Sequence, residues 1–230
     1  MKIITDQKYI DRNVKITKYI TWASLGVLGM GIYLTITQKE STQTLIITFA
    51  ALLIGFTLSQ ISIYMQNRWG KSPRPDELIT AALKGLDDKH TLYLFKSPLP
   101  HLLVSPNGIW GIIAYSQQGK ISYTGDRWKL KGGSTFRKIF AGESLGRPDL
   151  DSESLISDYS RGLSKLIPGQ TLPVLNVALV FTHPSIVIEA EDAPVPTIPL
   201  KKLKDLIRKR TKGELIPQET VDVINESLSK

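Results

Sequence analysis

The stretch HLLVSPNGIWGIIAY, residues His101–Tyr115, decides how the C-terminal two thirds of the chain fold. Two apolar runs rich in β-forming residues stand on either side of Pro106-Asn107-Gly108. Proline presets φ for a turn and Asn-Gly tolerates positive φ, so the stretch predicts a β-hairpin that turns at these three residues. The neighbouring segments must then supply the rest of a sheet and the helices that cover it.

Helical and strand patterns alternate around this hairpin. The run VLNVALVF, residues 174–181, is almost unbroken apolar sequence, which is typical of a strand buried on both faces. The order of elements predicts an α/β domain over residues 73–230, with a mixed central sheet and helices on its faces. The other predicted elements are a helix from Asp76 with Leu78, Ala81, Ala82 and Leu86 inward, a strand at 91–95, a strand or strand pair at 120–130 that turns near Gly125-Asp126, a helix capped by Ser152 or Ser154, an edge strand at 194–198, an amphipathic helix at 200–210 and a short helix from Pro217.

Two long uncharged runs lie in the N-terminal third of the chain. One lies between Lys18 and Lys39, and the other between Glu40 and Arg68. Each supplies the roughly 20 helical residues that cross a hydrocarbon core of about 30 Å. A helix also satisfies every backbone N–H and C=O there, so we predict a transmembrane helical hairpin. Its helices are expected within residues 19–67, at about 19–38 and 44–65, with Gly26, Gly29 and Gly31 allowing them to approach closely.

Basic residues flank the two runs unevenly. Residues 1–75 carry a net charge of +6, whereas the remainder carries only +2. The cations precede the first run and follow the second, and the linker between the runs holds only Lys39. The positive-inside rule therefore places the 1–18 segment and the 73–230 domain in the cytoplasm. We predict an integral protein of a bacterial inner membrane, with the lipid bilayer as its partner. The alternative, a pair of buried helices in a soluble protein, fits such long uncharged runs poorly.

Composition and motifs exclude several kinds of chemistry. The chain has no cysteine, which removes disulfides, thiolate metal sites and cysteine nucleophiles. No charged residue interrupts either apolar run, so nothing marks an ion or proton path. Phosphate-loop, G-x-S-x-G and H-E-x-x-H signatures are absent from the sequence.

The domain resembles the nuclease-related domain (NERD) family, whose core is similar to that of restriction-type endonucleases. Active members of that family carry an Asp-His at the start of the first hairpin strand and a Glu-x-Lys at the end of the second. The resemblance implies a restriction-endonuclease-like mixed sheet. The resemblance covers about residues 73–210 and lies in Glu77 on the first helix, His101, Pro106-Asn107-Gly108, Gly119-Lys120-Ile121 and Trp128.

The departures from the family pattern concern its chemistry. The family's Asp corresponds to Pro100, and its Glu-x-Lys corresponds to Ile113-Ala114-Tyr115. Neither proline nor isoleucine can ligate Mg²⁺, which takes oxygen ligands. Tyrosine cannot replace the ammonium that assists metal-bound hydroxide. Because Glu77 alone remains of the acidic set, we predict a nuclease fold that has lost its nuclease and needs no cofactor.

Two alternatives stay open. In a divergent active nuclease, Glu77 would share Mg²⁺ with carboxylates such as Asp87 or Asp126. In an accessory subunit of a membrane complex, an exposed apolar patch would meet a partner. The three histidines are weaker candidates: His90 in a solvated turn, His101 in the lining of the old cleft, and His183 in a loop.

Two basic clusters suggest anionic partners. The first interleaves Tyr123 and Trp128 with cations, and such a strip can follow a phosphate backbone while the aromatic rings stack on bases. The second lies on one helix and is either a solvated face or a contact with anionic lipids, at roughly 1 kcal/mol per Lys or Arg. The most consistent prediction is a membrane-anchored module that binds or scaffolds a protein partner, with nucleic acid as the alternative partner. The clusters comprise Lys120, Arg127, Lys129, Lys131, Arg137 and Lys138, and then Lys201, Lys202, Lys204, Arg208, Lys209, Arg210 and Lys212.

Overall fold

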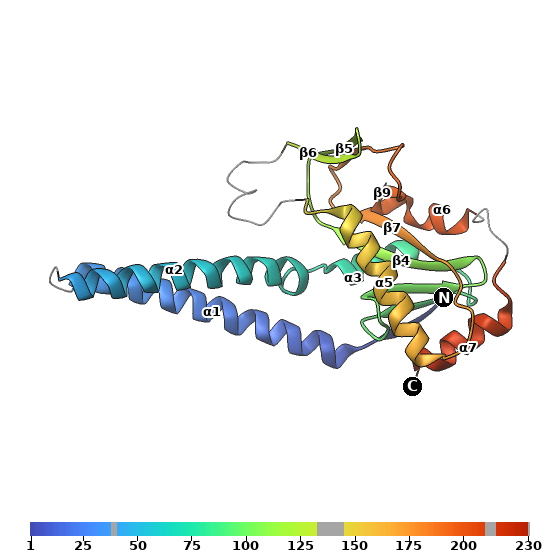
Figure 1. Cartoon of the computed structure of the whole chain (residues 1–230), viewed down its shortest axis with the longest axis horizontal. Coiled ribbons are helices and arrows are strands. Elements are labelled where there is room, and N and C mark those ends of the chain that lie inside the picture. Colours follow the sequence, from blue (N-terminus) through green and yellow to red (C-terminus); the bar gives the residue numbers. More distant parts are fainter. Residues whose placement is uncertain (38–40, 133–144, 210–214, 230) are drawn as a thin grey trace. The chain divides into compact units, whose positions relative to one another are not determined.

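The computed structural model describes residues 1–37, 41–132, 145–209 and 215–229 (Figure 1). Lys39 of the predicted linker lies outside these residues, as do four members of the predicted basic clusters: Arg137, Lys138, Arg210 and Lys212. The described residues form two compact units. One contains residues 8–74, and the other joins residues 1–7 to residues 75–132 and the described residues from 145 onward. Residues 1–7 were predicted as part of an N-terminal flank, and they belong to the α/β unit.

The unit of residues 8–74 consists of two long helices. Helices α1 (Gln7–Thr37) and α2 (Thr42–Met65) are each long and apolar enough to cross a membrane, and a π-helical turn, η1 (Gln66–Gly70), extends α2. Helix α1 begins well before residue 19, because the charged residues of the flank continue the same helix. Many large apolar side chains of this unit face outward, among them Trp22 at 73% exposure and Phe49 at 69%.

The two helices approach closely at glycine. A Cβ atom on Gly55 would lie 2.8 Å from the side chain of Leu28 and 3.1 Å from its backbone nitrogen. Gly31 likewise lies against side chains of α2, as predicted. The prediction is wrong for Gly26 and Gly29, which face away from α2. A Cβ atom added to either of them would have no atom within 4 Å.

Polar side chains also join the two helices. The Oγ1 atom of Thr21 lies 2.8 Å from the Oγ atom of Ser62. The amide of Gln66 donates to Thr21 Oγ1 at 3.2 Å and to Ser62 Oγ at 3.3 Å. These bonds satisfy hydroxyl groups between the helices, which is how small polar residues join helices in an apolar environment.

A six-stranded mixed sheet forms the centre of the α/β unit. Its order is β1-β2-β3-β4-β7-β9. The β3–β4 hairpin turns at Pro106-Asn107 as predicted, whereas β1–β2, β4–β7 and β7–β9 are parallel pairs. The strands are β1 (Lys2–Thr5), β2 (Thr91–Leu94), β3 (His101–Ser105), β4 (Gly108–Tyr115), β7 (Leu175–Phe181) and β9 (Thr197–Pro199).

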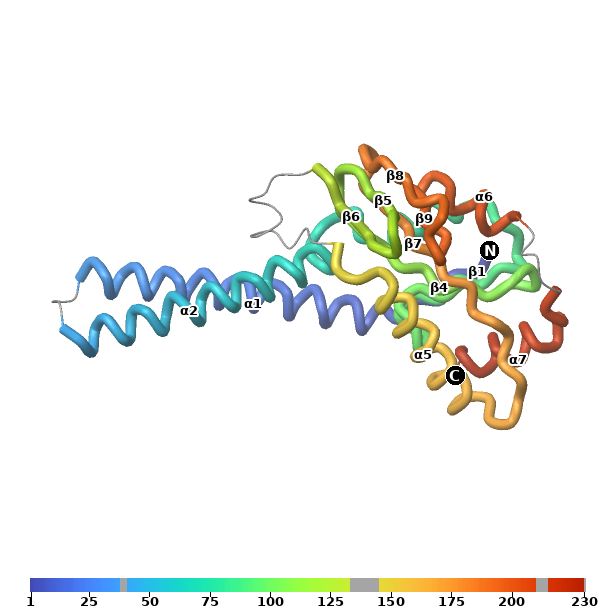
Figure 2. Tube along the Cα trace, turned by 45° about the horizontal axis from the view of Figure 1, so that its top comes forward, coloured from blue at the N-terminus to red at the C-terminus, as the bar shows by residue number. Residues whose placement is uncertain are grey.

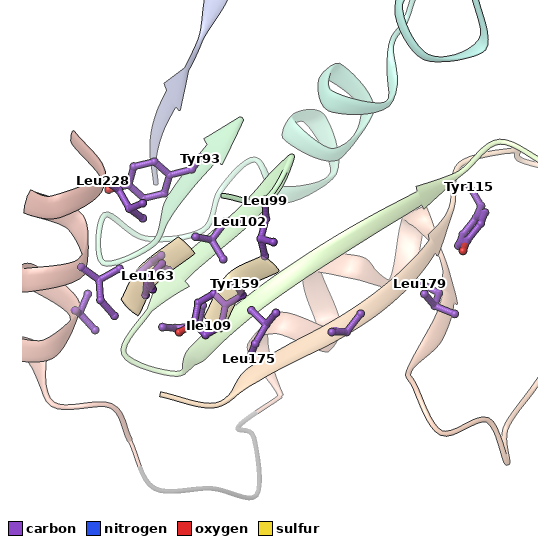
Figure 3. Close-up of a cluster of buried hydrophobic side chains, with 14 of the residues drawn as sticks. Tyr93, Leu99, Leu102, Ile109, Tyr115, Tyr159, Leu163, Leu175, Leu179 and Leu228 are labelled. Carbon is purple, nitrogen blue, oxygen red and sulfur yellow. The ribbon is translucent and has the colours of Figure 1, made fainter. Parts of the chain in front are cut away.

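Helices cover both faces of this sheet (Figures 1 and 2). On one face, α3 (Pro75–Leu83) and α6 (Leu203–Arg208), which follows the 3-10 turn η2 (Leu200–Lys202), pack on Leu92 and Ile112. On the other face, α5 (Pro148–Leu166) and α7 (Gln218–Ser229) pack on Tyr93, Leu102 and Ile109 (Figure 3). The predicted α/β architecture with a mixed sheet and flanking helices is confirmed at this level.

A second, three-stranded sheet was not predicted as a separate layer. It has the order β6-β5-β8, formed by β5 (Lys120–Thr124), β6 (Arg127–Lys131) and β8 (Val187–Glu189). The turn between β5 and β6 lies at Gly125-Asp126, as predicted, and both residues have φ of +57°. Positive φ at both central residues suits the right-handed twist of a two-residue hairpin.

Two local predictions are wrong. Helix α3 buries Ile79 and Leu83 rather than Leu78 and Ala81, because these two side chains fill the space above the sheet, whereas Leu86 is buried as predicted. Helix α5 begins at Pro148 rather than beside a serine cap, because proline's fixed φ suits the first helical position. Ser152 instead donates to the carbonyl of Pro148 at 2.8 Å.

Candidate functional site

The three positions that depart from the nuclease pattern lie along neighbouring strands on one face of the main sheet. In the β3–β4 ladder, Leu102 pairs with Gly111, and the same register continued by two residues sets Pro100 opposite Ile113. Ile113 and Tyr115 pack with the cluster beneath α5. The positions at which the predicted resemblance would place oxygen ligands and an ammonium are therefore occupied by Pro100, Ile113 and Tyr115.

Tyr115 is held at both ends of its side chain. Its ring stacks on Phe181, with centroids 5.1 Å apart and an interplanar angle of 17°. Its hydroxyl donates to the Oδ2 atom of Asp151 at 2.6 Å. Burial, followed by the hydrogen bond to Asp151, raises the pKa of Tyr115 above its ordinary value, so the phenol stays neutral.

A second aromatic donor reaches the same helix. The indole Nε1 of Trp128 donates to the Oδ1 atom of Asp149 at 2.7 Å. Asp149 and Asp151 both lie in the first turn of α5, where the helix dipole favours negative charge. The N-terminus of α5 is thereby tied to strands β4 and β6 by two charge-assisted hydrogen bonds.

Glu77 lies on the other side of the sheet. It belongs to α3, and the inward residues of this helix, Ile79 and Leu83, pack in the cluster that contains Ile112. Ile113 and Tyr115 alternate with Ile112 along β4 and contribute to the opposite cluster. The structure therefore does not bring Glu77 onto the face of the three departed positions.

The carboxylates offered as substitutes lie elsewhere. Asp87 Oδ1 is 2.6 Å from Nδ1 of His90, and this hydrogen bond holds the pKa of Asp87 below its ordinary value. Asp126 lies in the exposed β5–β6 turn, where its carboxylate accepts from Tyr123 at 3.4 Å. Across residues 1–37, 41–132, 145–209 and 215–229, no three His, Asp or Glu side chains gather closely enough to hold a metal ion.

The histidines differ in their surroundings. His90 was predicted in a solvated turn, and it is instead buried, at 5% exposure, because it directly precedes the buried strand β2. His101 is buried at the start of β3, where its Nδ1 donates to the carbonyl of Ile112 at 3.2 Å. His183 follows β7 in a loop, as predicted.

The first basic cluster forms one face of the three-stranded sheet. The side chains of Arg127, Lys129 and Lys131 alternate along β6 and are exposed, with Trp128 and Leu130 turned toward the core. Lys120 pairs with the carboxylate of Glu189 at 2.6 Å. The prediction that aromatic rings and cations share one exposed strip is wrong, because successive side chains on a strand point to opposite faces.

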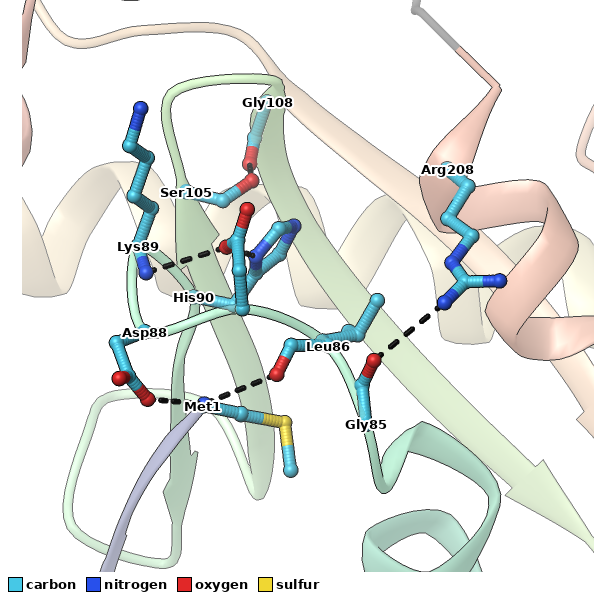
Figure 4. A network of polar contacts seen from close by, with 10 residues as sticks. Met1, Gly85, Leu86, Asp88, Lys89, His90, Ser105, Gly108 and Arg208 are labelled. Atoms are coloured by element: carbon cyan, nitrogen blue, oxygen red, sulfur yellow. Dashed lines mark hydrogen bonds and ion pairs between the residues drawn. The ribbon is translucent and has the colours of Figure 1, made fainter.

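The second basic cluster is divided between two roles. Lys204 Nζ donates to the carbonyl of Lys84 at 2.6 Å. Arg208 donates to the carbonyl of Gly85 at 3.4 Å (Figure 4). These cations satisfy carbonyls just beyond the end of α3, where a helix leaves its last acceptors unpaired. The other described members are exposed and have no such bond to another described residue: Lys201, Lys202 and Lys209.

Comparison with known proteins gives no relative: no family model, no curated protein and no solved structure matches the chain. The NERD resemblance thus rests on the quoted motifs alone. Sequence reasoning missed Asp149 and Asp151 as partners of Tyr115 and Trp128. The available signal was a pair of acids in the first turn of a predicted helix, which by itself indicates only dipole complementarity.

Proposed function

We propose that this protein is a membrane-anchored, NERD-like module that has lost nuclease activity and binds or scaffolds a partner at the cytoplasmic face of a bacterial inner membrane. The observation that carries the proposal is the hydrogen bond from Tyr115 to Asp151, at 2.6 Å. At the position where the family has its catalytic lysine, a neutral phenol is bonded to a helix acid and packed on Phe181. This arrangement is structural rather than catalytic.

The outward side chains of α1 and α2 support the anchor. Contiguous exposed apolar surface of this kind is covered in soluble proteins, and it suits lipid chains. The hydroxyl groups that the helices share are bonded between them rather than turned outward. Basic residues gather at the ends next to the α/β unit, where the positive-inside rule expects cytoplasm.

The connection of the two units also supports an even number of crossings. Strand β1 precedes α1 and is hydrogen-bonded in parallel to β2, which follows α2 by many residues. The chain thus leaves the sheet before α1 and returns to it after α2. Two crossings bring the chain back to the side from which it started, and one crossing would not.

The exposed face of β6 supports an anionic partner for the module. Arg127, Lys129 and Lys131 project from one side of the strand, and Glu189 is bound to Lys120 rather than to any of them. Such a row attracts phosphate groups of nucleic acid or acidic side chains of a protein, and the attraction weakens with salt. Among the described residues of β6, the one aromatic ring, Trp128, is turned to the opposite side, toward the core.

An assay of the full-length protein in lipid nanodiscs tests the loss of nuclease activity. Plasmid DNA and RNA are incubated with the protein and Mg²⁺ or Mn²⁺, beside a matched Glu77→Ala sample. We expect no cleavage that differs between the two samples. Metal-dependent cleavage by the wild-type protein that Glu77→Ala abolishes would establish the divergent nuclease instead, with Glu77 as a metal ligand.

A further inference from the structure

The carboxyl ends of β7 and β9 open onto a cavity of about 570 Å³. Its lining comes from the loop after β7, from β8 and from η2, all within the α/β unit. In open α/β sheets, ligands bind outside the carboxyl ends of the strands. The volume also lies in the range of about 300–1,000 Å³ that small-molecule sites occupy.

The walls of this cavity are largely apolar. Phe181 is fully buried at its base, and Ile186 and Ile198 are half-buried along its sides. Two prolines, Pro184 and Pro199, add rigid apolar surface. Such walls hold an apolar or planar body by excluding water from it.

The polar groups of the cavity are mainly cationic. Lys201 and Lys202 follow one another on η2, are exposed, and have no hydrogen-bond or ion-pair partner among the described residues. His183 adds a donor. The backbone N–H of Ser185 donates to its Nδ1 at 3.3 Å, so the proton of the neutral ring sits on Nε2. Glu191 is the acid that lines the same cavity.

We propose that this cavity binds a small phosphorylated molecule with an apolar or planar body. The body lies against Ile186 and Ile198, and the phosphate lies against Lys201 and Lys202. Two cationic side chains in the lining of one cavity match a phosphate better than a carboxylate, because the phosphate monoester carries up to two charges at neutral pH. The site requires neither the membrane anchor nor the loss of nuclease activity, so its test is independent of the proposed function.

Calorimetric titration of the full-length protein in nanodiscs tests this site with three probes. Adenosine monophosphate has both the ring and the phosphate, adenosine has the ring alone, and inorganic phosphate has the charge alone. We expect the monophosphate to bind and each of the other two to bind about tenfold or more weakly. Equal binding of adenosine and its monophosphate, or no binding of the monophosphate at millimolar concentration, would overturn the proposal.

Variants locate the binding. The pair Lys201→Gln and Lys202→Gln is expected to weaken monophosphate binding by about tenfold or more, because both charge-assisted contacts are lost. The matched pair Lys89→Gln and Lys165→Gln removes equal charge at exposed positions outside the cavity lining and is expected to leave binding unchanged. Equal loss in both pairs would show a nonspecific attraction to the basic protein and would contradict the site.

A cavity-filling substitution gives a second measurement. Ile186→Trp places a large ring in the cavity while leaving both lysines present, so monophosphate binding is expected to disappear. Circular dichroism of the same sample reports whether the domain is folded. If the folded variant binds as tightly as the wild type, the ligand does not occupy this cavity. If the variant is unfolded, the lysine pairs decide the outcome.

Discussion

At the scale of single residues, Tyr115 does two things that a lysine in its place would not do together. Its ring stacks on Phe181 and its hydroxyl reaches Asp151. A lysine ammonium can pair with Asp151, but its flexible stem offers no ring for Phe181. The tyrosine at this position thereby adds a structural contact between β4 and the first turn of α5.

The first prediction concerns that contact. Tyr115→Phe keeps the stacked ring and removes the hydroxyl, so we expect a loss of about 1–2 kcal/mol in the free energy of unfolding at neutral pH. Thermal unfolding of the full-length protein measures it. The control is Tyr123→Phe, whose exposed hydroxyl reaches Asp126 only at 3.4 Å and should contribute little. Equal effects of the two substitutions would contradict a special role for Tyr115.

The same bond has a predictable pH dependence. The pKa of Tyr115 is raised in the folded state, so folding favours the protonated phenol. Its stabilisation is therefore complete below the ordinary tyrosine pKa of about 10 and is lost as pH rises above it. We expect the stability difference between wild type and Tyr115→Phe to shrink above that pH. A difference that instead grows with pH would contradict the assigned protonation state.

Sequence reasoning named the three positions that differ from the quoted nuclease motif, but it did not find the contact that Tyr115 makes. Pro100, Ile113 and Tyr115 could be named because a turn motif fixes the register of a hairpin. The partner of Tyr115 is Asp151, on a helix that follows a long intervening segment. Nothing local in the sequence determines which acid of that first turn a distant phenol will meet.

At the scale of elements, the packing of α1 on α2 depends on Gly55. We predict that Gly55→Ala weakens it by about 1–3 kcal/mol, because the new methyl group meets the backbone of Leu28 and the helices must separate. The control is Gly26→Ala, whose methyl group meets no atom within 4 Å. Oxidative cross-linking of a Thr21→Cys and Ser62→Cys pair, whose wild-type oxygens lie 2.8 Å apart, measures the approach in each background.

We expect cross-linking to slow in the Gly55→Ala background and to stay unchanged with Gly26→Ala. The chain has no cysteine of its own, so the introduced pair is the only source of a disulfide. Identical rates in all three backgrounds would mean that Gly55 does not set the distance between the helices.

Elements with a strong local signal were predicted correctly. The Pro106-Asn107 and Gly125-Asp126 turns carry their own backbone requirements, and the apolar run of β7 lies between two neighbouring strands. Strand β9 is at the sheet edge, where its proline is tolerated. Elements specified by distant contacts were missed: the inward stripe of α3 depends on what packs beneath it, and β1 becomes a strand through pairing with β2.

At the scale of the whole molecule, strand β1 constrains how the chain can cross a membrane. It is part of the same sheet as the strands that follow α2. If α1 and α2 both cross, the two ends of the helical hairpin return to one side and the short linker lies on the other. This is the arrangement that the basic flanks independently favour.

Labelling of single cysteines with a membrane-impermeant maleimide tests this topology, since the natural chain has none. Gln43→Cys, at the start of α2, should react in intact spheroplasts. Lys8→Cys, at the start of α1, and Ser164→Cys, on the exposed side of α5, should react only after detergent opens the membrane. Labelling of Ser164→Cys with protection of Gln43→Cys would reverse the orientation. Equal labelling of all three before detergent would mean that the helices do not cross, because the bilayer is then no barrier between the linker and the sheet to which β1 belongs.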